Sequence, residues 1–264
     1  MGSIAKKTVW ITGASSGIGE ALTYELNKMG CKLIVSARNE TALQQVKNNC
    51  HNSDFVKIIP LDLENYCAMA LKVKEAIASF GGIDILINNA GISQRSYIVD
   101  TDFAVYKKLM DINYLGTVAL TKALLPHFLT QQNGHFVTVT SLMGKFGSPL
   151  RSGYCGAKHA LHGFFDVLRM EHEKDGVDIT LICPGFVQTN IAKNALTGDG
   201  SSQNQEDSAT ANGMSSKILS HKMIGAIEKR KFEVYLGGKE TFAVYLKRFF
   251  PRLLHRVVLK SEVT

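Results

Sequence analysis

The stretch TGASSGIG, residues 12–19, follows the apolar run Thr8–Thr12 and opens a segment whose apolar residues recur at helical spacing. Glycines in a turn from strand to helix let the backbone bend sharply and approach a pyrophosphate, and the helix N-terminus attracts the phosphate charge. A tight turn that binds nothing is the alternative, but the strand–turn–helix setting favours a dinucleotide site. The motif assigns these residues to the cofactor: Gly13, Ser15, Ser16, Gly17, Ile18 and Gly19.

Apolar runs rich in β-branched residues alternate with helical patterns along most of the chain. This alternation predicts a single-domain α/β Rossmann fold, with a doubly wound, seven-stranded parallel sheet and helices on both faces. The predicted strands are Thr8–Thr12, Lys32–Ala37, Phe55–Leu61, Ile83–Ile87, His135–Thr140, Val177–Cys183 and Phe232–Leu236. The longer predicted helices are Glu64–Ser79, Asp102–Gln131 and Gly153–Lys174.

One polar segment interrupts the alternation. Gly198–Asn212 is rich in Gly, Ser, Gln, Asn and Asp, and is too polar for a core. A polar loop of this length before the last strand indicates a mobile lid or disorder. A lid over the substrate is expected around residues 186–216, inside the one domain that spans residues 1–264.

The end of the second predicted strand bears on the choice of cofactor. A site for NAD(H) carries Asp or Glu there to bind the ribose hydroxyls, whereas this chain reads Ser36-Ala37-Arg38-Asn39. Ala37 replaces the carboxylate that would repel a 2′-phosphate, and the Arg38 guanidinium matches a phosphate in shape and charge. NADP(H) is therefore the expected cofactor, although a surface cation at a strand end is the simpler interpretation of Arg38.

Composition and charge narrow the class of protein. The 264 residues are 45% hydrophobic and carry a formal net charge of +7, which fits a globular domain with an anionic partner such as a phosphate-bearing cofactor. No run reaches the roughly 18 apolar residues of a membrane-spanning helix, and Met1–Lys7 has neither a signal-peptide core nor a myristoylation pattern. We expect a cytoplasmic protein without a metal or a nucleic-acid partner. The cysteines form no Cys-x-x-Cys pair and are expected to be reduced core residues: Cys31, Cys50, Cys67, Cys155 and Cys183.

Residues 239–264 form a basic, amphipathic tail. Two interpretations are open: a segment that packs on its own domain or on a second subunit, and an interfacial helix that contacts a membrane. Pro251 interrupts the helical period, which favours the first interpretation. The cations interleaved with apolar residues are Lys247, Arg248, Arg252, Arg256 and Lys260.

Further motifs follow the predicted strands in order. Asn88-Asn89-Ala90-Gly91 comes after the fourth strand, Ser141 ends the fifth, and Tyr154 and Lys158 form Tyr-x-x-x-Lys. This order resembles the short-chain dehydrogenase/reductase family, classical type, over nearly the whole chain. Residues 141–163 and the tail resemble its branch with the membrane-associated dehydrogenase/reductase member seven group, whose N-terminal membrane anchor is not expected here. The resemblance implies these further cofactor contacts: Asp62, Leu63, Asn89, Ala90, Gly91, Tyr154, Lys158, Pro184, Gly185, Val187 and Thr189.

The resemblance also implies a catalytic set. Reducing a carbonyl needs a hydride from the nicotinamide and a proton for the forming alkoxide. Tyr154 would be the acid, and Lys158, one helical turn away, would stabilise its phenolate and hold the nicotinamide ribose. Ser141 would hydrogen-bond to the same oxygen, and Asn113 would anchor a water that relays the proton.

These residues predict an NADP(H)-dependent oxidoreductase that moves a hydride between the nicotinamide and a carbonyl or secondary alcohol. The alternatives are a 3-oxoacyl-carrier-protein reductase and a non-catalytic NADP(H)-sensing protein. The family pairs helices at the positions of Asp102–Gln131 and Gly153–Lys174 between subunits, so a homodimer or homotetramer is expected. A hydrophobic small-molecule substrate is expected from the residues at the pocket positions: Leu142, Met143, Phe146, Phe186 and Ile191. The histidines at 127, 135, 159 and 162 have no ligand-like spacing and are expected to be ordinary helix or strand residues.

Overall fold

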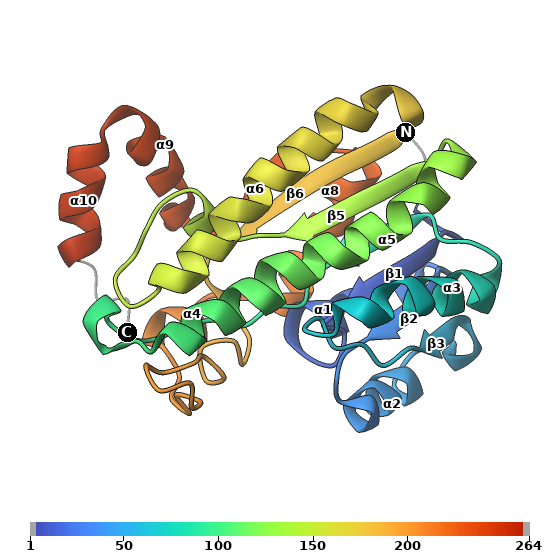
Figure 1. Ribbon diagram of the computed structural model, residues 1–264, viewed down its shortest axis with the longest axis horizontal. Coiled ribbons are helices and arrows are strands. Elements are labelled where there is room, and N and C mark those ends of the chain that lie inside the picture. The colour runs from blue at the N-terminus through green and yellow to red at the C-terminus, as the bar shows by residue number, and fades with distance from the viewer. Residues whose placement is uncertain (1–3, 261–264) are drawn as a thin grey trace.

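Seven parallel strands form the central sheet of the computed structural model, which describes residues 4–260 (Figure 1). Their order is β3-β2-β1-β4-β5-β6-β9, which confirms the predicted single-domain Rossmann architecture. The predicted strand over Phe55–Leu61 is shorter in the structure, because Ser53–Phe55 forms a 3-10 turn and Pro60 has no N–H for the ladder. The strands are β1 (Thr8–Thr12), β2 (Lys32–Ser36), β3 (Val56–Ile58), β4 (Ile85–Asn88), β5 (Gly134–Val139), β6 (Val177–Pro184) and β9 (Glu233–Leu236).

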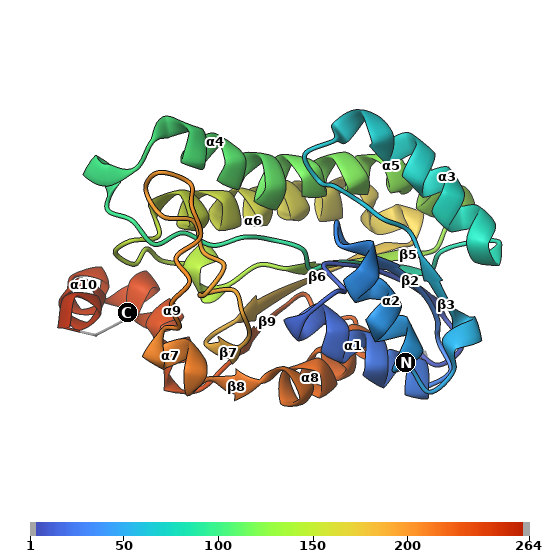
Figure 2. The same ribbon diagram turned by 90° about the horizontal axis from the view of Figure 1, so that it is seen from below.

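Helices cover both faces of the sheet (Figure 2). Because successive side chains of a strand point to opposite faces, Val9 and Ile11 pack into one core cluster and Trp10 into the other. The first cluster lies under α1 (Gly17–Lys28), α2 (Glu40–Asn48) and α8 (Ser216–Glu228). The second lies under α3 (Met69–Phe80), α5 (Gly116–Gln131) and α6 (Ser152–His172), with α4 (Phe103–Met110) packed on α6.

The helix predicted over Asp102–Gln131 has an irregular turn in the middle. α4 is followed by a π-helical turn, Asp111–Leu115, before α5 begins at Gly116. A single π-turn inside a helix shifts the side chains that follow it and often marks a functional position. This turn carries Asn113, whose side chain is fully buried. The other long helices agree with their predicted spans apart from 3-10 turns at Tyr66–Ala68 and Glu173–Asp175.

The polar segment before the last strand is packed on the domain. Main-chain hydrogen bonds join its start, and Leu196 just before it, to the loop after β4, from Arg95 N to Leu196 O at 2.8 Å and from Asp102 N to Gly198 O at 2.9 Å. Contrary to the expectation that this segment is too polar for the interior, Asp207 is only 2% exposed. Two guanidinium groups compensate its charge, as described below. The segment ends in α7 (Ser208–Ala211) and a short ladder between β7 (Val187–Gln188) and β8 (Met214–Ser215).

The tail forms two short helices, α9 (Phe242–Phe249) and α10 (Pro251–Lys260), at one end of the molecule (Figure 1). Leu254 is buried against Leu142, Phe146 and Cys183, so one side of the tail packs on its own domain. Within residues 4–260, no helix combines the length and the apolar character that crossing a membrane requires. The predictions that fall on residues 1–3 and 261–264 lie outside the described residues.

Candidate functional site

A cavity of roughly 1070 Å³ opens at the carboxyl ends of the strands. Pockets for small ligands commonly measure about 300–1,000 Å³, so this space can hold a large cofactor together with a substrate. Ligands bind in such α/β sheets outside the carboxyl ends of the strands, where the strand order reverses. The cavity wall includes the glycine-rich turn after β1, the residues after β2 to β6, and part of the tail.

The turn after β1 is held in a shape that only glycine permits. Gly13 has φ of +66°, and a Cβ there would come within 2.8 Å of Ala90 Cα. A Cβ at Gly19 would lie 2.3 Å from the Gly13 carbonyl oxygen. The Asn89 amide donates to the Thr12 and Gly13 carbonyls at 3.0 and 3.2 Å, which fixes the turn against the loop after β4. This tight cradle at the N-terminus of α1 fits the pyrophosphate of a dinucleotide.

The residues at the ends of β2 and β3 line the same cavity. Arg38 is exposed at its mouth, next to Ala37, while Asp62 and Leu63 lie beside them at the end of β3. Among the described residues, Asp62 and Glu240 are the acidic residues on the cavity wall, and neither belongs to the end of β2. This end of the cavity therefore presents the Arg38 guanidinium and no carboxylate from the end of β2.

Tyr154 and Lys158 enter the cavity from α6, and Ser141 from the end of β5. The Lys158 Nζ lies 5.7 Å from the centre of the Tyr154 ring, and a hydrogen bond joins the side chains of Tyr154 and Ser141. The Ser141 hydroxyl also accepts from the Met143 N–H at 3.1 Å, which starts the 3-10 turn Leu142–Gly144. The structure thus brings the three predicted catalytic side chains to one wall.

Asn113 lies behind Lys158. Its Oδ1 accepts from Ile92 N at 2.8 Å and its Nδ2 donates to Ile92 O at 3.0 Å. A Cβ at Gly91 would lie 2.7 Å from the Asn113 Oδ1 and 3.5 Å from the Lys158 Nζ, so the three residues are neighbours. The Lys158 amine donates to the Val139 carbonyl at 2.9 Å. The π-helical turn is what places Asn113 there.

Burial dominates the protonation of this pair. It raises the pKa of Tyr154, and the hydrogen bond from Ser141 lowers that pKa only in part. Burial also lowers the pKa of Lys158 to about 8. The Arg95 and Arg151 charges also lower the Tyr154 pKa, but burial of the phenolate outweighs them. The expected stabilisation of the phenolate by Lys158 stays a prediction. Tyr154 is a neutral acid in this state.

The Pro184-Gly185 segment is braced by a residue that the sequence analysis did not select. The Glu240 Oε1 accepts from Phe186 N at 3.3 Å and from Gly238 N at 3.0 Å. A Cβ at Gly185 would lie 2.1 Å from the same oxygen, so a larger residue there would displace the Glu240 carboxylate. The Gly237-Gly238 pair just before Glu240 was the available signal. Val187 and Thr189 follow this segment on the cavity wall.

The substrate end of the cavity is less apolar than the sequence predicts. The expected residues all lie on its wall: Leu142, Met143, Phe146, Phe186 and Ile191. Two positively charged side chains join them, however, because Arg95 and Arg151 also line the cavity. The Arg95 Nε donates to Asp207 at 3.1 Å, and the Arg151 Nη2 donates to the same carboxylate at 3.2 Å. Burial raises the pKa of Asp207, but the hydrogen bond and charge of Arg95 outweigh it and keep the pKa low.

Gln94 is a second residue that the sequence did not single out. Its side chain is buried, and its Oε1 accepts from Gly153 N at 2.8 Å and from Tyr154 N at 3.4 Å. These N–H groups belong to the first turn of α6, where no helical partner exists. Gln94 therefore caps the catalytic helix from a distant loop.

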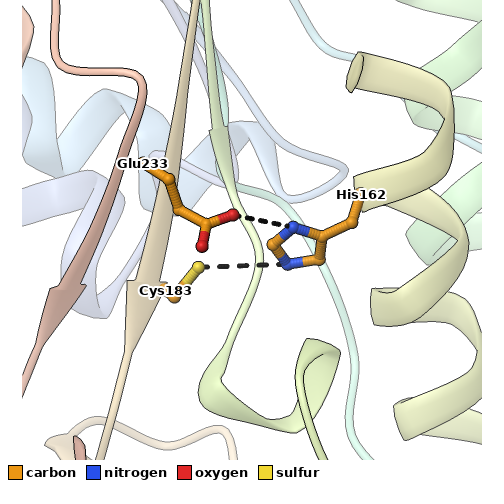
Figure 3. A group of neighbouring side chains, drawn as sticks. All are labelled: His162, Cys183 and Glu233. Atoms are coloured by element: carbon orange, nitrogen blue, oxygen red, sulfur yellow. Dashed lines mark hydrogen bonds and ion pairs between the residues drawn. The ribbon is translucent and has the colours of Figure 1, made fainter. Parts of the chain in front are cut away.

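Behind the Ser141 loop, the structure gathers His162, Cys183 and Glu233 (Figure 3). His162 has no ligand-like spacing in the sequence, but β9 brings Glu233 to it from 71 residues away. His162 Nδ1 lies 3.2 Å from Glu233 Oε2, while its Nε2 faces the Cys183 Sγ at 3.9 Å. The two ring nitrogens thus face different groups, and one donor atom from each of the three residues lies within 4.8 Å of the other two.

Glu233 also contacts the loop that follows Ser141, residues 141–147, through Lys145. The Lys145 Nζ lies 2.7 Å from its Oε2, and the Tyr235 hydroxyl donates to its other oxygen. Burial raises the pKa of Glu233, but polar contacts with His162, Lys145 and Tyr235 outweigh it and bring the pKa to about 2. Burial raises the pKa of the Cys183 thiol to about 12. Glu233 is therefore an ionised anchor, and Cys183 is a neutral thiol.

The five cysteines are all free thiols. Cys31, Cys155 and Cys183 are buried as expected, and Cys50 is half-buried. Cys67 is exposed, which departs from the expected core position, because the 3-10 turn Tyr66–Ala68 lies on the surface ahead of α3.

Comparisons with known proteins show the family of this chain. A family model described as short chain dehydrogenase matches residues 7–199. Dehydrogenase/reductase SDR family member 7 from Homo sapiens is 48% identical over 197 residues, which cover 72% of this chain and 58% of the human protein. Dehydrogenase/reductase SDR family member 7B from Rattus norvegicus is 39% identical over 258 residues, which cover 95% of this chain and 79% of the rat protein. This chain thus spans little more than half the length of the human relative.

Solved structures share the fold. A short chain dehydrogenase/reductase from Burkholderia phymatum in complex with NAD superimposes with a TM-score of 0.83 at 22% identity, covering 100% of this chain and 98% of the other. A short-chain dehydrogenase from Streptomyces avermitilis gives 0.81 at 24% identity, covering 97% and 98%.

Proposed function

The chain belongs to the short-chain dehydrogenase/reductase family of nicotinamide-dependent oxidoreductases, and on that premise we propose that it transfers a hydride between NADP(H) and a carbonyl or secondary alcohol. The observation that carries the proposal is the convergence of Tyr154, Ser141 and Lys158 on one cavity that also contains the glycine cradle. A protein that only senses NADP(H) has no need for this arrangement of proton donors, so catalysis is favoured over sensing.

The side chains divide the chemistry among them. The nicotinamide, when bound, supplies or accepts the hydride. In the reducing direction, the neutral Tyr154 hydroxyl donates its proton to the carbonyl oxygen as negative charge develops there. The Ser141 hydroxyl donates a hydrogen bond to the same oxygen and stabilises the charge. The Lys158 amine supplies a nearby positive charge that eases the loss of the Tyr154 proton, and Asn113 lies beside this amine, where we expect it to anchor a water that relays the proton.

NADP(H) is proposed as the cofactor on the residues at the end of β2. Arg38 stands at the cavity mouth with its guanidinium in solvent, and Ala37 precedes it without a carboxylate. A 2′-phosphate would gain a charge-assisted, two-pronged contact with Arg38, and NADH would not.

A hydrophobic substrate is proposed from the wall around the reacting groups. Leu142 and Phe146 are buried there, and α10 adds Leu254 and Val258 from the tail. These side chains exclude water from the substrate, which strengthens the polar contacts of Tyr154 and Ser141.

Two substitutions test the proposal with a panel of hydrophobic carbonyl compounds. Tyr154→Phe should lower kcat by at least about 100-fold, the lower range for loss of a general acid, while the affinity for NADPH stays near that of the parent. Tyr66→Phe, at an exposed tyrosine, is the matched control. Retention of most activity in Tyr154→Phe would contradict the mechanism.

Arg38→Asp tests the cofactor separately. The parent should use NADPH with a kcat/KM at least about tenfold above that for NADH, the scale of one charged hydrogen bond, and the variant should reverse this preference. Lys57→Asp, on β3 away from the cavity, controls for the change in net charge. Equal use of the two cofactors by the parent would overturn the choice of NADP(H) and leave the mechanism standing.

A further inference from the structure

The outer side of the tail is unusually apolar for a surface. Phe242, Tyr245 and Phe249 follow one another at spacings of three and four residues, so they share one face of α9, and each is more than half exposed. Phe250 and Leu253 extend this apolar surface across the junction with α10. Contiguous exposed aromatic residues mark an interaction site more often than they mark an ordinary surface. We name α9 and α10 together, residues 242–260, the tail hairpin.

The tail hairpin also carries positive charge with no compensation of its own. Residues 242–260 include no Asp or Glu. All of its Lys and Arg side chains are exposed, and none lies within ion-pair distance of a carboxylate in the described part of the chain. Arg252, Arg256 and Lys260 recur every four residues and form a stripe along α10. Apolar and cationic stripes thus lie side by side on one small unit.

A second exposed apolar segment lies at the same end of the molecule. Tyr97, Ile98, Val99 and Phe103 lead into α4, and each is more than 60% exposed. Figures 1 and 2 share their horizontal axis, and both show this segment and the tail hairpin at the left end. The inner side of the hairpin, through Leu254 and Val258, belongs to the cavity wall. The apolar surfaces therefore flank the substrate end of the cavity.

We propose that the tail hairpin docks on the surface of a phospholipid bilayer that contains anionic lipid. The exposed aromatic side chains would enter the headgroup region, where aromatic rings are favoured, and the cations would contact lipid phosphates and carboxylates. A second copy of the chain fits less well, because a two-fold contact through the hairpin would set five cations against the same five. The proposal does not depend on which cofactor or substrate the enzyme uses.

Docking would set the cavity next to the bilayer surface. Leu254 and Val258 face the cavity while Leu253 and Leu259, on the same helix, are exposed. A helix with one face in the cavity wall and the other in the headgroup region would join the two environments.

The test uses the full chain and flotation with vesicles of phosphatidylcholine alone or mixed with phosphatidylserine. The parent should float with the anionic vesicles at low salt and not with the neutral ones. Arg252→Gln with Arg256→Gln should weaken this binding about 25-fold, since each basic residue near an anionic surface contributes about a factor of five. Phe249→Ser with Phe250→Ser should weaken it at least about tenfold through lost apolar burial.

Matched controls lie far from the tail hairpin. Lys217→Gln with Lys222→Gln removes two exposed cations from α8, and Leu71→Ser removes an exposed apolar residue from α3. These proteins should bind vesicles as the parent does. None of the tested tail residues lines the cavity, so turnover in solution should not change in any variant.

Three results would overturn the proposal. The first is a parent protein that does not float with anionic vesicles at low salt. The second is an aromatic variant that binds as tightly as the parent, because the attraction would then be one of charge alone. The third is a tail variant that changes from dimer to monomer in sedimentation while it binds vesicles like the parent, which would identify a second copy as the occupant.

Discussion

Lys158→Met should change how the stability of the cofactor-free protein depends on pH. The Lys158 amine is buried, and burial lowers its pKa from the ordinary 10.5 to about 8. At about 1.4 kcal/mol per pH unit, this gap means that the buried charge destabilises the folded protein by about 3 kcal/mol at pH 7. Methionine fills a similar volume without a charge, so the variant is free of this penalty.

The direction follows from proton binding. Below pH 8 the amine is charged in the folded and the unfolded chain, and the penalty is complete. Between pH 8 and 10.5 the unfolded chain binds more protons, so the penalty decreases as the pH rises. At pH 9.5 about 1.4 kcal/mol remains, a decrease of about 2 kcal/mol from pH 7. The lost hydrogen bond to the Val139 carbonyl destabilises the variant by about 1–3 kcal/mol at both pH values and cancels from the comparison.

Urea denaturation of both proteins at pH 7 and pH 9.5 measures this effect. The free energy of unfolding of Lys158→Met, minus that of the parent, should be about 2 kcal/mol smaller at pH 9.5 than at pH 7, because only the parent gains stability as the pH rises. Lys222→Met, at an exposed lysine on α8, is the matched control and should show no such change. An equal relative stability of Lys158→Met at the two pH values would refute the burial of a charged amine at this site.

Two further predictions concern the anchors around the cavity. Asp207→Asn leaves the Arg95 and Arg151 guanidiniums without their shared carboxylate, and should destabilise the protein by about 3–5 kcal/mol in urea denaturation, whereas Asp54→Asn, at an exposed carboxylate, should have a small effect. An Asp207→Asn protein as stable as the parent would show that this ion pair does not hold residues 198–212 on the domain. Glu233→Gln weakens the contacts to Lys145 and His162 behind Ser141, so kcat should fall about tenfold with an unchanged KM for NADPH, and equally at pH 6 and pH 9 because Glu233 is ionised throughout that range. The exposed Glu171→Gln is its control, and a higher KM for NADPH with unchanged kcat would contradict a role at the Ser141 loop.

The sequence was sufficient for the sheet and for the order of the site residues, because local patterns specify both. The glycine-rich turn is contiguous in the chain. Each remaining motif directly follows a strand that can be recognised from its apolar run. Parallel strands end at one edge of the sheet, so Ser141, Asn89 and Pro184 meet there once the strand order is known. Tyr154 and Lys158 share a helix face by their spacing alone.

Contacts between distant charges could not be predicted in this way. Arg95 and Asp207 are 112 residues apart, and composition alone makes a segment with Asp207 look like solvent-exposed loop. The burial of that carboxylate depends on two guanidiniums from other elements, and no local pattern shows that they will converge. The contact between His162 and Glu233 could not be predicted for the same reason. Glu233 belongs to β9, and it comes near His162 only because β9 lies at the edge of the sheet.

The structural role of Pro251 differs from the role that its place in the sequence indicates. In the sequence it interrupts a helical period and counts against a continuous interfacial helix. In the structure it is the first residue of α10, where its missing N–H would have had no helical partner and its fixed φ suits the helix. The chain therefore turns between Phe249 and Pro251 and begins again in a second helix, with Leu254 and Val258 on the inner side and Arg252 and Arg256 outside. The interruption at Pro251, which in the sequence counted against a membrane-binding helix, thus places the cationic helix α10 beside the aromatic helix α9.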